Sequence, residues 1–397
     1  MSNLTSHIVN LKLLIALYVT TIILLFFYSF TQVDLNLTLS RLSIYQTAEK
    51  YFQQIGYFQR YLSAEIYIAI LLLLFAFYFF FLALAKKNRI SKKQLWMLVI
   101  STAVILTFSY NAFSYDLFNY IFDAKIVTHY HQSPYLYRAL DFAGEPMLSF
   151  MRWTHRVYPY GPTWLGLTVP LSFIGLNVFL PTFFIFKALM SASFLGTAYF
   201  IGKILKKVSP KTEILGLAFF ALNPLVIIES LVSSHNDITM MFFAMMALYL
   251  FLSQKYVRAF ILLFISIGVK FATGFILPVL AGALVWKRFK RNIPRGNIVI
   301  LICALMSTAI VVASVRTNFQ PWYLLYVLPF AALLPNKYYI AFPSVILSFS
   351  SLLIYVPFLQ NGNWDPPIPE RLFWITAVGA AFALVSVLVF RFKNLLE

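Results

Sequence analysis

The chain has 397 residues, of which 61% are hydrophobic and only 11% charged, with a formal net charge of +18. Its mean hydropathy is +0.81. A soluble core of this size does not need so much apolar surface. Repeated apolar runs near the length of a bilayer span predict a polytopic membrane protein, in which the backbone must be helical to satisfy its own hydrogen bonds. The composition therefore predicts an all-α transmembrane helical bundle.

The basic residues cluster at the ends of apolar runs. Four clusters show this placement: Lys86–Lys93, Lys203–Lys211, Lys287–Arg295 and Arg391–Lys393. Placing all four on one side of the membrane satisfies the positive-inside rule, so both termini are expected to be cytoplasmic. The excess positive charge is then expected to contact membrane lipids, with no nucleic-acid partner. The predicted location is the cell membrane, as a multi-pass protein.

The apolar runs predict about 11–13 membrane spans. The first run, Leu13–Phe30, is too long for the core of a signal peptide and lacks a cleavage site, so we interpret it as a retained span. The predicted spans, in chain order, are residues 12–31, 63–85, 95–113, 180–202, 213–232, 238–253, a hairpin over 259–286, 297–315, 323–336, 339–358 and 372–390.

These spans suggest three regions. Residues 1–94 form an N-terminal transmembrane hairpin, and residues 338–397 form a C-terminal one. Between them lies a core, residues 95–337, whose large outer-face loop spans residues 114–177. The loop is too aromatic and apolar to be a solvated tether, so it is expected to lie on the membrane as amphipathic helices.

Two segments depart from the simple pattern of crossings. The apolar run Trp164–Asn177 is short, and counting it as a span would violate the charge rule, so it is expected to be interfacial or re-entrant. The run Ala259–Trp286 begins and ends at cytoplasmic basic clusters, so two helices must share it. Lys270 then lies at the apex of this hairpin, inside the membrane or at its outer edge.

The outer loop begins with two carboxylates, Asp116 and Asp123, seven residues apart. On a helix this spacing places both on one face, two turns apart, with Tyr120 between them. A carboxylate at the boundary between apolar and polar surroundings can have its pKa raised and act as a general base. Asp116 is also typical of a helix N-cap, and the residues alone favour the cap over the base.

Three cations fall within or beside predicted spans: Lys187, Lys270 and Arg316. Ionisable groups at membrane depth are usually functional, and such cations commonly hold a phosphate. The alternative is that they snorkel to the interface, which is strongest for Arg316 near a span end. Glu229 is also predicted to be buried and could pair with one of these cations.

The sequence His235-Asn236-Asp237 lies in a short outer element. These residues could be metal ligands or hydrogen-bond partners of a polar ligand, and a polar turn that caps the next helix is at least as consistent with the spacing. No nucleotide-binding, zinc-protease or serine-hydrolase motif is present in the sequence, so soluble nucleotide chemistry has no visible site.

Four motifs together resemble a known family. The chain reads "SYDLFNYIFDAKIV…SPY" followed by "YPYGPTW", then "NPLVIIESLVSSHND", "GVKFATGFILP" and "QPWYLLYVLP". This order, over about Leu95 to Asn336, resembles membrane glycosyltransferases of the GT-C superfamily, and most closely the prokaryotic polyprenyl-phosphate-mannose-dependent mannosyltransferases. The hairpin before Leu95 has no clear counterpart in that pattern.

The resemblance implies roles for individual residues. Asp116 matches the loop aspartate that deprotonates the acceptor hydroxyl, and Asp123 matches a second acidic position that orients the acceptor or helps to hold a metal. No cofactor is certain, although a divalent cation, Mg²⁺ or Mn²⁺, would fit at Asp116 and Asp123. Other residues expected to contact substrate are Tyr120, Tyr160, Lys187, His235, Asp237, Lys270, Arg316 and Gln320, with the lysines on the lipid phosphate and His235 and Asp237 along the sugar.

The implied activity is transfer of a sugar, with mannose expected, from a polyprenyl-phosphate donor to a glycan, lipid or protein acceptor on the extracytoplasmic face. Such a donor carries its own membrane anchor and needs no nucleotide site. A single displacement with Asp116 as the general base would invert the anomeric configuration.

A transporter or flippase for lipid-linked saccharides would also use buried cations and aromatic grooves. Transporters often contain internal repeats with paired broken helices and a site near the midplane. The sequence shows no second copy of the Asp116 loop or of the Lys270 hairpin, and its charged features gather on one face. The enzyme is therefore favoured, with the flippase as the alternative.

Overall fold

The computed structural model describes residues 2–289 and 294–396, and that part of the chain is helical, without strands. This confirms the all-α prediction. The helices of the first half are α1 (Ser2–Ser29), α2 (Ser43–Gln53), α3 (Arg60–Lys86), α4 (Lys92–Thr107), α5 (Asp116–Thr128), α6 (Pro162–Ile174) and α7 (Phe179–Val208). Those of the second half are α8 (Glu213–Ala221), α9 (Pro224–Ile227), α10 (Asp237–Leu252), α11 (Tyr256–Val269), α12 (Leu277–Arg288), α13 (Arg295–Thr317), α14 (Leu328–Ala331), α15 (Tyr338–Leu352), α16 (Tyr355–Asn361) and α17 (Ile368–Leu396).

Short 3-10 and π-helical turns join these helices. The 3-10 turns are η1 (Phe30–Gln32), η3 (Ala139–Asp141), η4 (Pro146–Ser149), η5 (Pro210–Thr212), η7 (Phe271–Ile276) and η8 (Pro321–Tyr326). The π-helical turns are η2 (Gln54–Phe58) and η6 (Ile228–Val232).

Seven helical segments in the described residues are long and apolar enough to cross a membrane, or eight if one bent pair is counted as a span. The seven are Leu11–Gln32, Arg60–Lys86, Phe179–Val208, Phe271–Arg288, Arg295–Thr317, Tyr338–Asn361 and Ile368–Phe392. The bent pair, Pro210–Ala221 with Pro224–Val232, changes direction by 55° at Asn223-Pro224. These findings support a multi-pass membrane protein.

The seven long segments are fewer than the spans expected from the sequence, because several apolar runs form shorter helices. α4 and α10 have 16 residues each and α11 has 14. At 1.5 Å per residue they measure about 21–24 Å, less than the roughly 30 Å hydrocarbon core. The predicted span 323–336 is irregular, since it contains only the end of η8 and the four-residue α14.

The two segments that depart from the predicted pattern of crossings, Trp164–Asn177 and Ala259–Trp286, contain the short helix and the break at Lys270 that the sequence predicts. The run beginning at Trp164 lies in the short helix α6, which starts at Pro162 directly after Gly161. Proline is favoured at the first position of a helix because its missing N–H is not needed there. The hairpin 259–286 breaks at Lys270, whose backbone is extended between α11 and η7.

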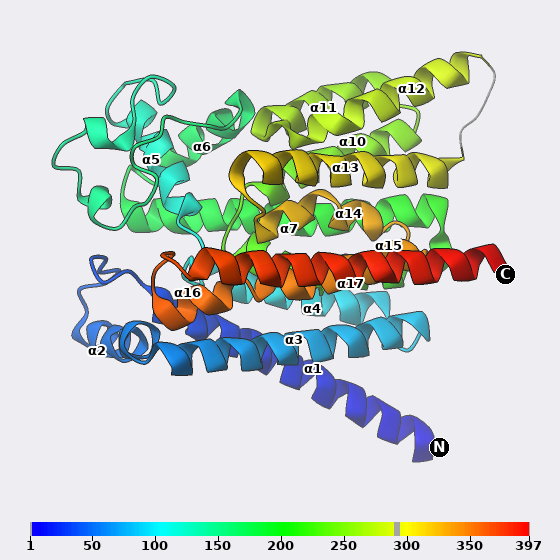
Figure 1. The fold of residues 1–397 in the computed structure, drawn as a ribbon, viewed down its shortest axis with the longest axis horizontal. Helices are drawn as coiled ribbons and strands as arrows, with labels where there is room; N and C mark the ends of the chain where they lie inside the picture. The colour runs from blue at the N-terminus through cyan, green and yellow to red at the C-terminus, as the bar shows by residue number, and fades with distance from the viewer. Residues whose placement is uncertain (1, 290–293, 397) are drawn as a thin grey trace.

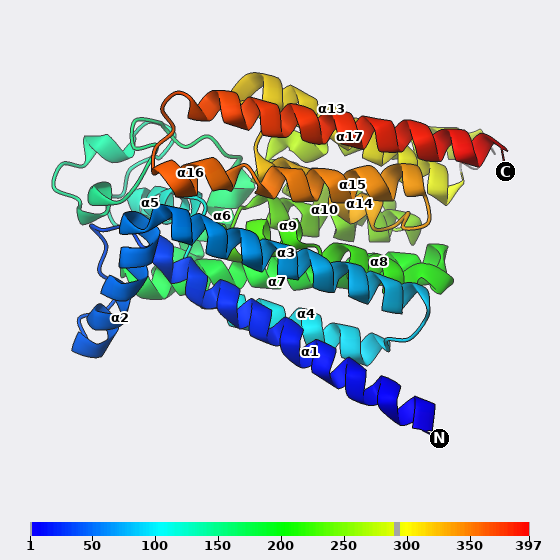
Figure 2. The same ribbon diagram turned by 60° about the horizontal axis from the view of Figure 1, so that its bottom comes forward.

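Both termini lie at one end of the bundle, and the large loop with α5 and α6 lies at the other (Figure 1). The C-terminal ends of α3, α7, α12 and α17, which carry the basic clusters, are at the same end as the termini (Figures 1 and 2). This grouping is the one that the charge pattern predicts. Residues 290–293 of the cluster Lys287–Arg295 lie outside the described residues.

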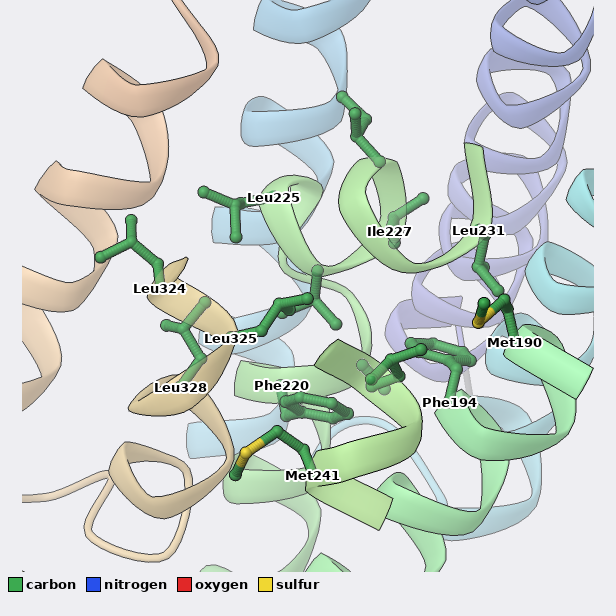
Figure 3. Close-up of a cluster of buried hydrophobic side chains, with 14 of the residues drawn as sticks. Met190, Phe194, Phe220, Leu225, Ile227, Leu231, Met241, Leu324, Leu325 and Leu328 are labelled. Atoms are coloured by element: carbon green, nitrogen blue, oxygen red, sulfur yellow. The ribbon is translucent and has the colours of Figure 1, made fainter. Parts of the chain in front are cut away.

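The core lies where the central helices meet (Figure 3). It consists of close-packed aliphatic, aromatic and methionine side chains that are nearly or completely buried. The labelled members are Met190, Phe194, Phe220, Leu225, Ile227, Leu231, Met241, Leu324, Leu325 and Leu328. The broken segments η6, η8 and α14 are thus enclosed by protein, which is the setting in which non-helical backbone is tolerated at membrane depth.

Two of the quoted motifs touch through glycine. The backbone N–H of Gly161, in "YPYGPTW", donates to the carbonyl of Val269, in "GVKFATGFILP", at 3.4 Å. A β-carbon at Gly161 would collide with the backbone carbonyl of Gly268. This close approach joins the outer loop to the Lys270 break.

We expect Gly161→Ala to lower the free energy of unfolding by about 1–3 kcal/mol, because the obstructing atoms are backbone and overpacked sites relax poorly. Gly166→Ala is the matched control. Gly166 lies inside α6 with open space around its Cα, so alanine there should be neutral or stabilising by up to about 1 kcal/mol. Denaturant unfolding in detergent would measure both variants, and equal losses would contradict the proposed role of the contact.

Candidate active site

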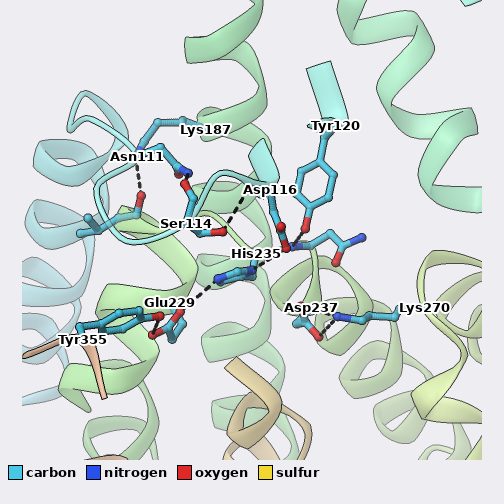
Figure 4. A network of polar contacts seen from close by, with 12 residues as sticks. Asn111, Ser114, Asp116, Tyr120, Lys187, Glu229, His235, Asp237, Lys270 and Tyr355 are labelled. Atoms are coloured by element: carbon cyan, nitrogen blue, oxygen red, sulfur yellow. Dashed lines mark hydrogen bonds and ion pairs between the residues drawn. The ribbon is translucent and has the colours of Figure 1, made fainter. Parts of the chain in front are cut away.

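Asp116 is the first residue of α5, and its side chain is 18% exposed. The N-cap position belongs to Tyr115, while the backbone N–H of Asp116 donates to the hydroxyl of Ser114 at 3.1 Å. The Asp116 carboxylate therefore does not serve as the helix cap. It points toward His235, from a different part of the chain (Figure 4).

His235 is completely buried between two carboxylates. Its Nδ1 lies 3.4 Å from Oδ2 of Asp116, and its Nε2 lies 3.3 Å from Oε2 of Glu229 (Figure 4). Glu229 is also fully buried, and its other oxygen accepts a hydrogen bond from the Tyr355 hydroxyl at 2.8 Å. A chain of polar contacts thus runs from the partly exposed Asp116 into the bundle.

The two carboxylates stabilise the charged form of His235, and His235 in turn stabilises the charged form of Asp116. Burial lowers the pKa of His235, but the hydrogen bonds and charges of Asp116 and Glu229 outweigh burial and raise it to about 9. Burial likewise opposes ionisation of Asp116, yet the hydrogen bond and positive charge of His235 hold the pKa of this carboxyl below its usual value. The expectation of a raised pKa at this boundary is therefore wrong, because His235 outweighs burial. At neutral pH the site therefore contains a protonated His235 beside an ionised Asp116.

Aromatic side chains hold this cluster in place. The ring of Trp322 stacks on His235 with centroids 3.9 Å apart and planes 22° apart. The hydroxyl of Tyr120 accepts a hydrogen bond from the backbone N–H of Asn236 at 3.5 Å. Tyr160 packs edge-on against Tyr120, with centroids 5.2 Å apart, so both predicted tyrosines lie beside the cluster.

Asp237 and Lys270 form the second polar pair of the site. The Lys270 ammonium donates to both oxygens of Asp237, at 2.8 and 3.0 Å. Asp237 is buried, whereas the Lys270 side chain is 22% exposed and lies over the rings of Tyr323 and Tyr326. Two of the three ammonium donors are thus engaged by the carboxylate, and the remaining one is available to a ligand.

Lys187 lies apart from this pair. Lys187 is a buried residue of α7. Its ammonium donates to the hydroxyl of Ser109 at 3.0 Å and to the carbonyls of Leu231 and Val232 at 2.7 and 3.4 Å. These contacts tie α7 to the end of η6. Glu229 was a candidate partner for Lys187 or Lys270, but its contacts are with His235 and Tyr355 instead.

Asp123 lies on the same helix as Asp116, as predicted, but in the described part of the chain no nearby positive charge stabilises its ionised form. Burial and the negative charge of Asp116 raise its pKa to about 8. Asp123 is therefore mainly protonated at neutral pH and can donate a hydrogen bond. In residues 2–289 and 294–396 no group of three or more His, Cys, Asp and Glu side chains is arranged to hold a metal.

The two remaining predicted contacts lie at the edge of the site. Arg316 is exposed in the last turn of α13. Gln320 is half-buried at the start of η8, two residues before Trp322. The structure does not bring either side chain into contact with the Asp116 cluster through any described hydrogen bond or ion pair.

A separate cavity of about 290 Å³ lies on another side of α5. It is lined in part by Lys125, Glu145 and Asn177, and Lys125 is paired with Glu145 at 2.8 Å. Lys125 follows Asp116 by nine residues, or two and a half helical turns, so the two face opposite sides of α5. This cavity is distinct from the predicted site.

The sequence did not indicate two residues of the cluster, Trp322 and Tyr355, or the partner of a third, Glu229. Trp322 was inside a quoted motif, but no property of that motif indicated a contact with His235. Tyr355 carried no local signal at all. Glu229 stood out as a buried acid, although nothing in the sequence identified its partner.

The fold and the site define a polytopic membrane protein with an acid–base cluster beside a paired cation. Residues 20–287 match a family model described as alpha-(1->6)-mannopyranosyltransferase, N-terminal domain. The chain belongs to this family, the MptA_B family of GT-C-type mannosyltransferases, which confirms the resemblance drawn from its motifs. The match begins at residue 20, so it includes most of the N-terminal hairpin, for which the motifs alone gave no clear counterpart. No curated protein and no solved structure matches the chain.

Removing Glu229 should be costly, because it leaves the buried His235 ring without its second carboxylate. We expect Glu229→Ala to lower the free energy of unfolding by about 3–5 kcal/mol. Lys92→Ala is the control, since it breaks the ion pair with Glu213 at the surface, where Lys92 is 52% exposed. That variant should cost at most about 1 kcal/mol. Similar losses in the two variants would show that the buried contact is not stabilising.

Proposed function

We propose that this protein transfers mannose from a polyprenyl-phosphate-linked donor to an acceptor hydroxyl at the extracytoplasmic face of the cell membrane. The observation that carries the proposal is the partly exposed Asp116 carboxylate, kept ionised by His235 at the end of the bundle opposite the basic clusters. A carboxylate in this state, at hydrogen-bonding reach of a hydroxyl, can act as a general base.

The proposed reaction is a single displacement. Asp116 accepts the proton of the acceptor hydroxyl, whose oxygen forms a bond to the anomeric carbon as the bond from that carbon to the phosphate oxygen breaks. The leaving phosphate takes the bonding electrons, and in this proposal the remaining donor of Lys270, whose ammonium is oriented by Asp237, stabilises its charge. Attack from the face opposite the phosphate inverts the anomeric configuration.

The family name supports the choice of sugar and linkage. The matched model is named for an alpha-(1->6)-mannopyranosyltransferase. We therefore propose an α-(1→6)-linked mannosyl product, formed on the 6-hydroxyl of a mannose residue in a glycan, glycolipid or glycosylated protein. Inversion at one centre requires that the donor be β-linked to its phosphate.

A flippase for lipid-linked saccharides fits the observations less well. The helices α5 and α16, which begin at Asp116 and Tyr355 of the acid–base cluster, lie toward the end of the bundle that carries the large loop, away from the termini (Figure 1). A carrier that alternates access would place its site near the midplane, between related repeats. Family membership also favours a transferase.

We expect Asp116→Asn to lower mannosyl transfer by about 10²–10⁴-fold, because the variant lacks the base but keeps the side-chain shape. The assay uses purified protein, a radiolabelled polyprenyl-phosphate mannose and a mannose oligosaccharide acceptor. Asp141→Asn is the control on the same loop, since Asp141 is partly exposed and paired only with Arg138 nearby in sequence. Undiminished transfer by Asp116→Asn would overturn the base assignment. Movement of the lipid across liposomes without any glycosidic product would support the flippase.

A divalent cation, Mg²⁺ or Mn²⁺, would be held by Asp116 and Asp123 if the reaction uses one. Because the pKa of Asp123 is raised to about 8, this carboxyl is mainly protonated at pH 7 and is then a poor second ligand for a cation. We therefore expect EDTA to leave the transfer rate at pH 7 unchanged. Loss of transfer with EDTA and its recovery with Mg²⁺ or Mn²⁺ would instead show that these carboxylates share a cation.

A further inference from the structure

Asn236 occupies the N-cap position of α10 without acting as a cap. Asparagine is favoured there because its side-chain oxygen accepts a hydrogen bond from the second or third N–H of the helix. Asn236 makes no such bond. Asn223, the N-cap of α9, does: it accepts from the N–H of Leu225 at 2.9 Å and donates to the Ser348 hydroxyl at 3.2 Å.

The Asn236 carboxamide is also completely buried. Its side chain has no exposed surface, and neither Nδ2 nor Oδ1 has a hydrogen-bond partner among the described residues. The hydroxyls of Ser233 and Ser234, just before it, are in the same state. Burying a polar group without a hydrogen-bond partner is unfavourable, so we expect a bound molecule to supply the partner of this carboxamide.

The neighbours of Asn236 place it between the two polar pairs of the site. His235 on one side is directed at Asp116, and Asp237 on the other is bound to Lys270 (Figure 4). The backbone N–H of Asn236 is held by the Tyr120 hydroxyl. Asn236 is thus the residue between one that contacts Asp116 and one that contacts Lys270, and a ligand bound by both groups would lie near it.

The chemistry of a carboxamide indicates what it binds. It is neutral, with two N–H donors and one acceptor oxygen, and it can engage a hydroxyl in either role. The charged groups on both sides already have partners of opposite charge. Beside the one ammonium donor that Lys270 keeps for an anion, the unpaired carboxamide of Asn236 gives the site an unmatched capacity for an uncharged hydroxyl group.

We propose that Asn236 binds a ring hydroxyl of the transferred sugar and sets which sugar is accepted. This inference rests on the proposed function, because it assumes a sugar between Asp116 and Lys270. A site built to bond a hydroxyl rejects an analogue without it, since its own buried groups are then unpaired.

The test compares wild type and Asn236→Ala with polyprenyl-phosphate mannose and with its 2-, 3-, 4- and 6-deoxy analogues. Wild type should transfer one of the deoxy sugars with kcat/KM lower by about 10- to 100-fold. Asn236→Ala should lose a similar factor with the full sugar and no longer distinguish that deoxy analogue from it. Equal discrimination by the two proteins would overturn the inference and would indicate that Asn236 binds only a buried water.

Stability supplies an independent readout, with Asn223→Ala as the matched control. Both asparagines are fully buried N-cap residues, but only Asn223 is bonded. Asn223→Ala should lower Tm by a few degrees, whereas Asn236→Ala should leave it unchanged. An equal loss in Asn236→Ala, including failure to fold, would show that its carboxamide is structural and would overturn the inference.

The two proposals fail in different ways. If wild type forms no mannosyl product from any of the donors, the proposed function is wrong and the role of Asn236 in it falls too. If wild type forms product but Asn236→Ala keeps the same preference among the analogues, only the inference about Asn236 is wrong.

Discussion

The burial of His235 between Asp116 and Glu229 is the constraint on which the site depends. A charged ring inside a helical bundle is stable only when opposite charges and packed neighbours replace water. Here one carboxylate comes from the start of α5 and the other from η6, while Trp322 covers a face of the ring. The cluster therefore joins four distant parts of the sequence: Asp116, the segment from Glu229 to His235, Trp322 and Tyr355. These parts must be assembled correctly for His235 to keep Asp116 ionised.

The broken helices make this assembly possible. In a regular α-helix the backbone N–H and C=O groups bond to one another, and only the side chains face outward. Backbone and side-chain polar atoms therefore come together most easily where helices end or break. Glu229 lies in a π-helical turn, His235 in the following loop, Lys270 at an extended break and Trp322 in a 3-10 turn. The interruptions cost regular hydrogen bonds, and the buried core of Figure 3 includes residues of two of them, Leu231 of η6 and Leu325 of η8.

How far the sequence could predict this arrangement depended on the range of each interaction. Helical periodicity alone placed Asp116 and Asp123 on one helix, and charge placement alone predicted a break at Lys270. The pairing of Asp116 with His235 joins residues more than a hundred positions apart, and hydropathy carries no information on such contacts. Hydropathy also predicts more spans than the seven or eight long apolar segments of the described residues, because it does not distinguish a long helix from a shorter one or from the irregular buried segment at 323–336.

Lys187 and Lys270 show why residue type and depth alone do not define a function. Both are lysines among apolar residues, and both were expected to hold a phosphate. The Lys187 ammonium has three oxygen partners, a hydroxyl and two carbonyls, so an anion would have to displace contacts that hold α7 against η6. The Lys270 ammonium is bound on one side by Asp237 and is still partly exposed. Because Asp237 orients this ammonium without enclosing it, the proposed contact of Lys270 with a phosphate would need little rearrangement, which is the condition for preorganised electrostatic stabilisation.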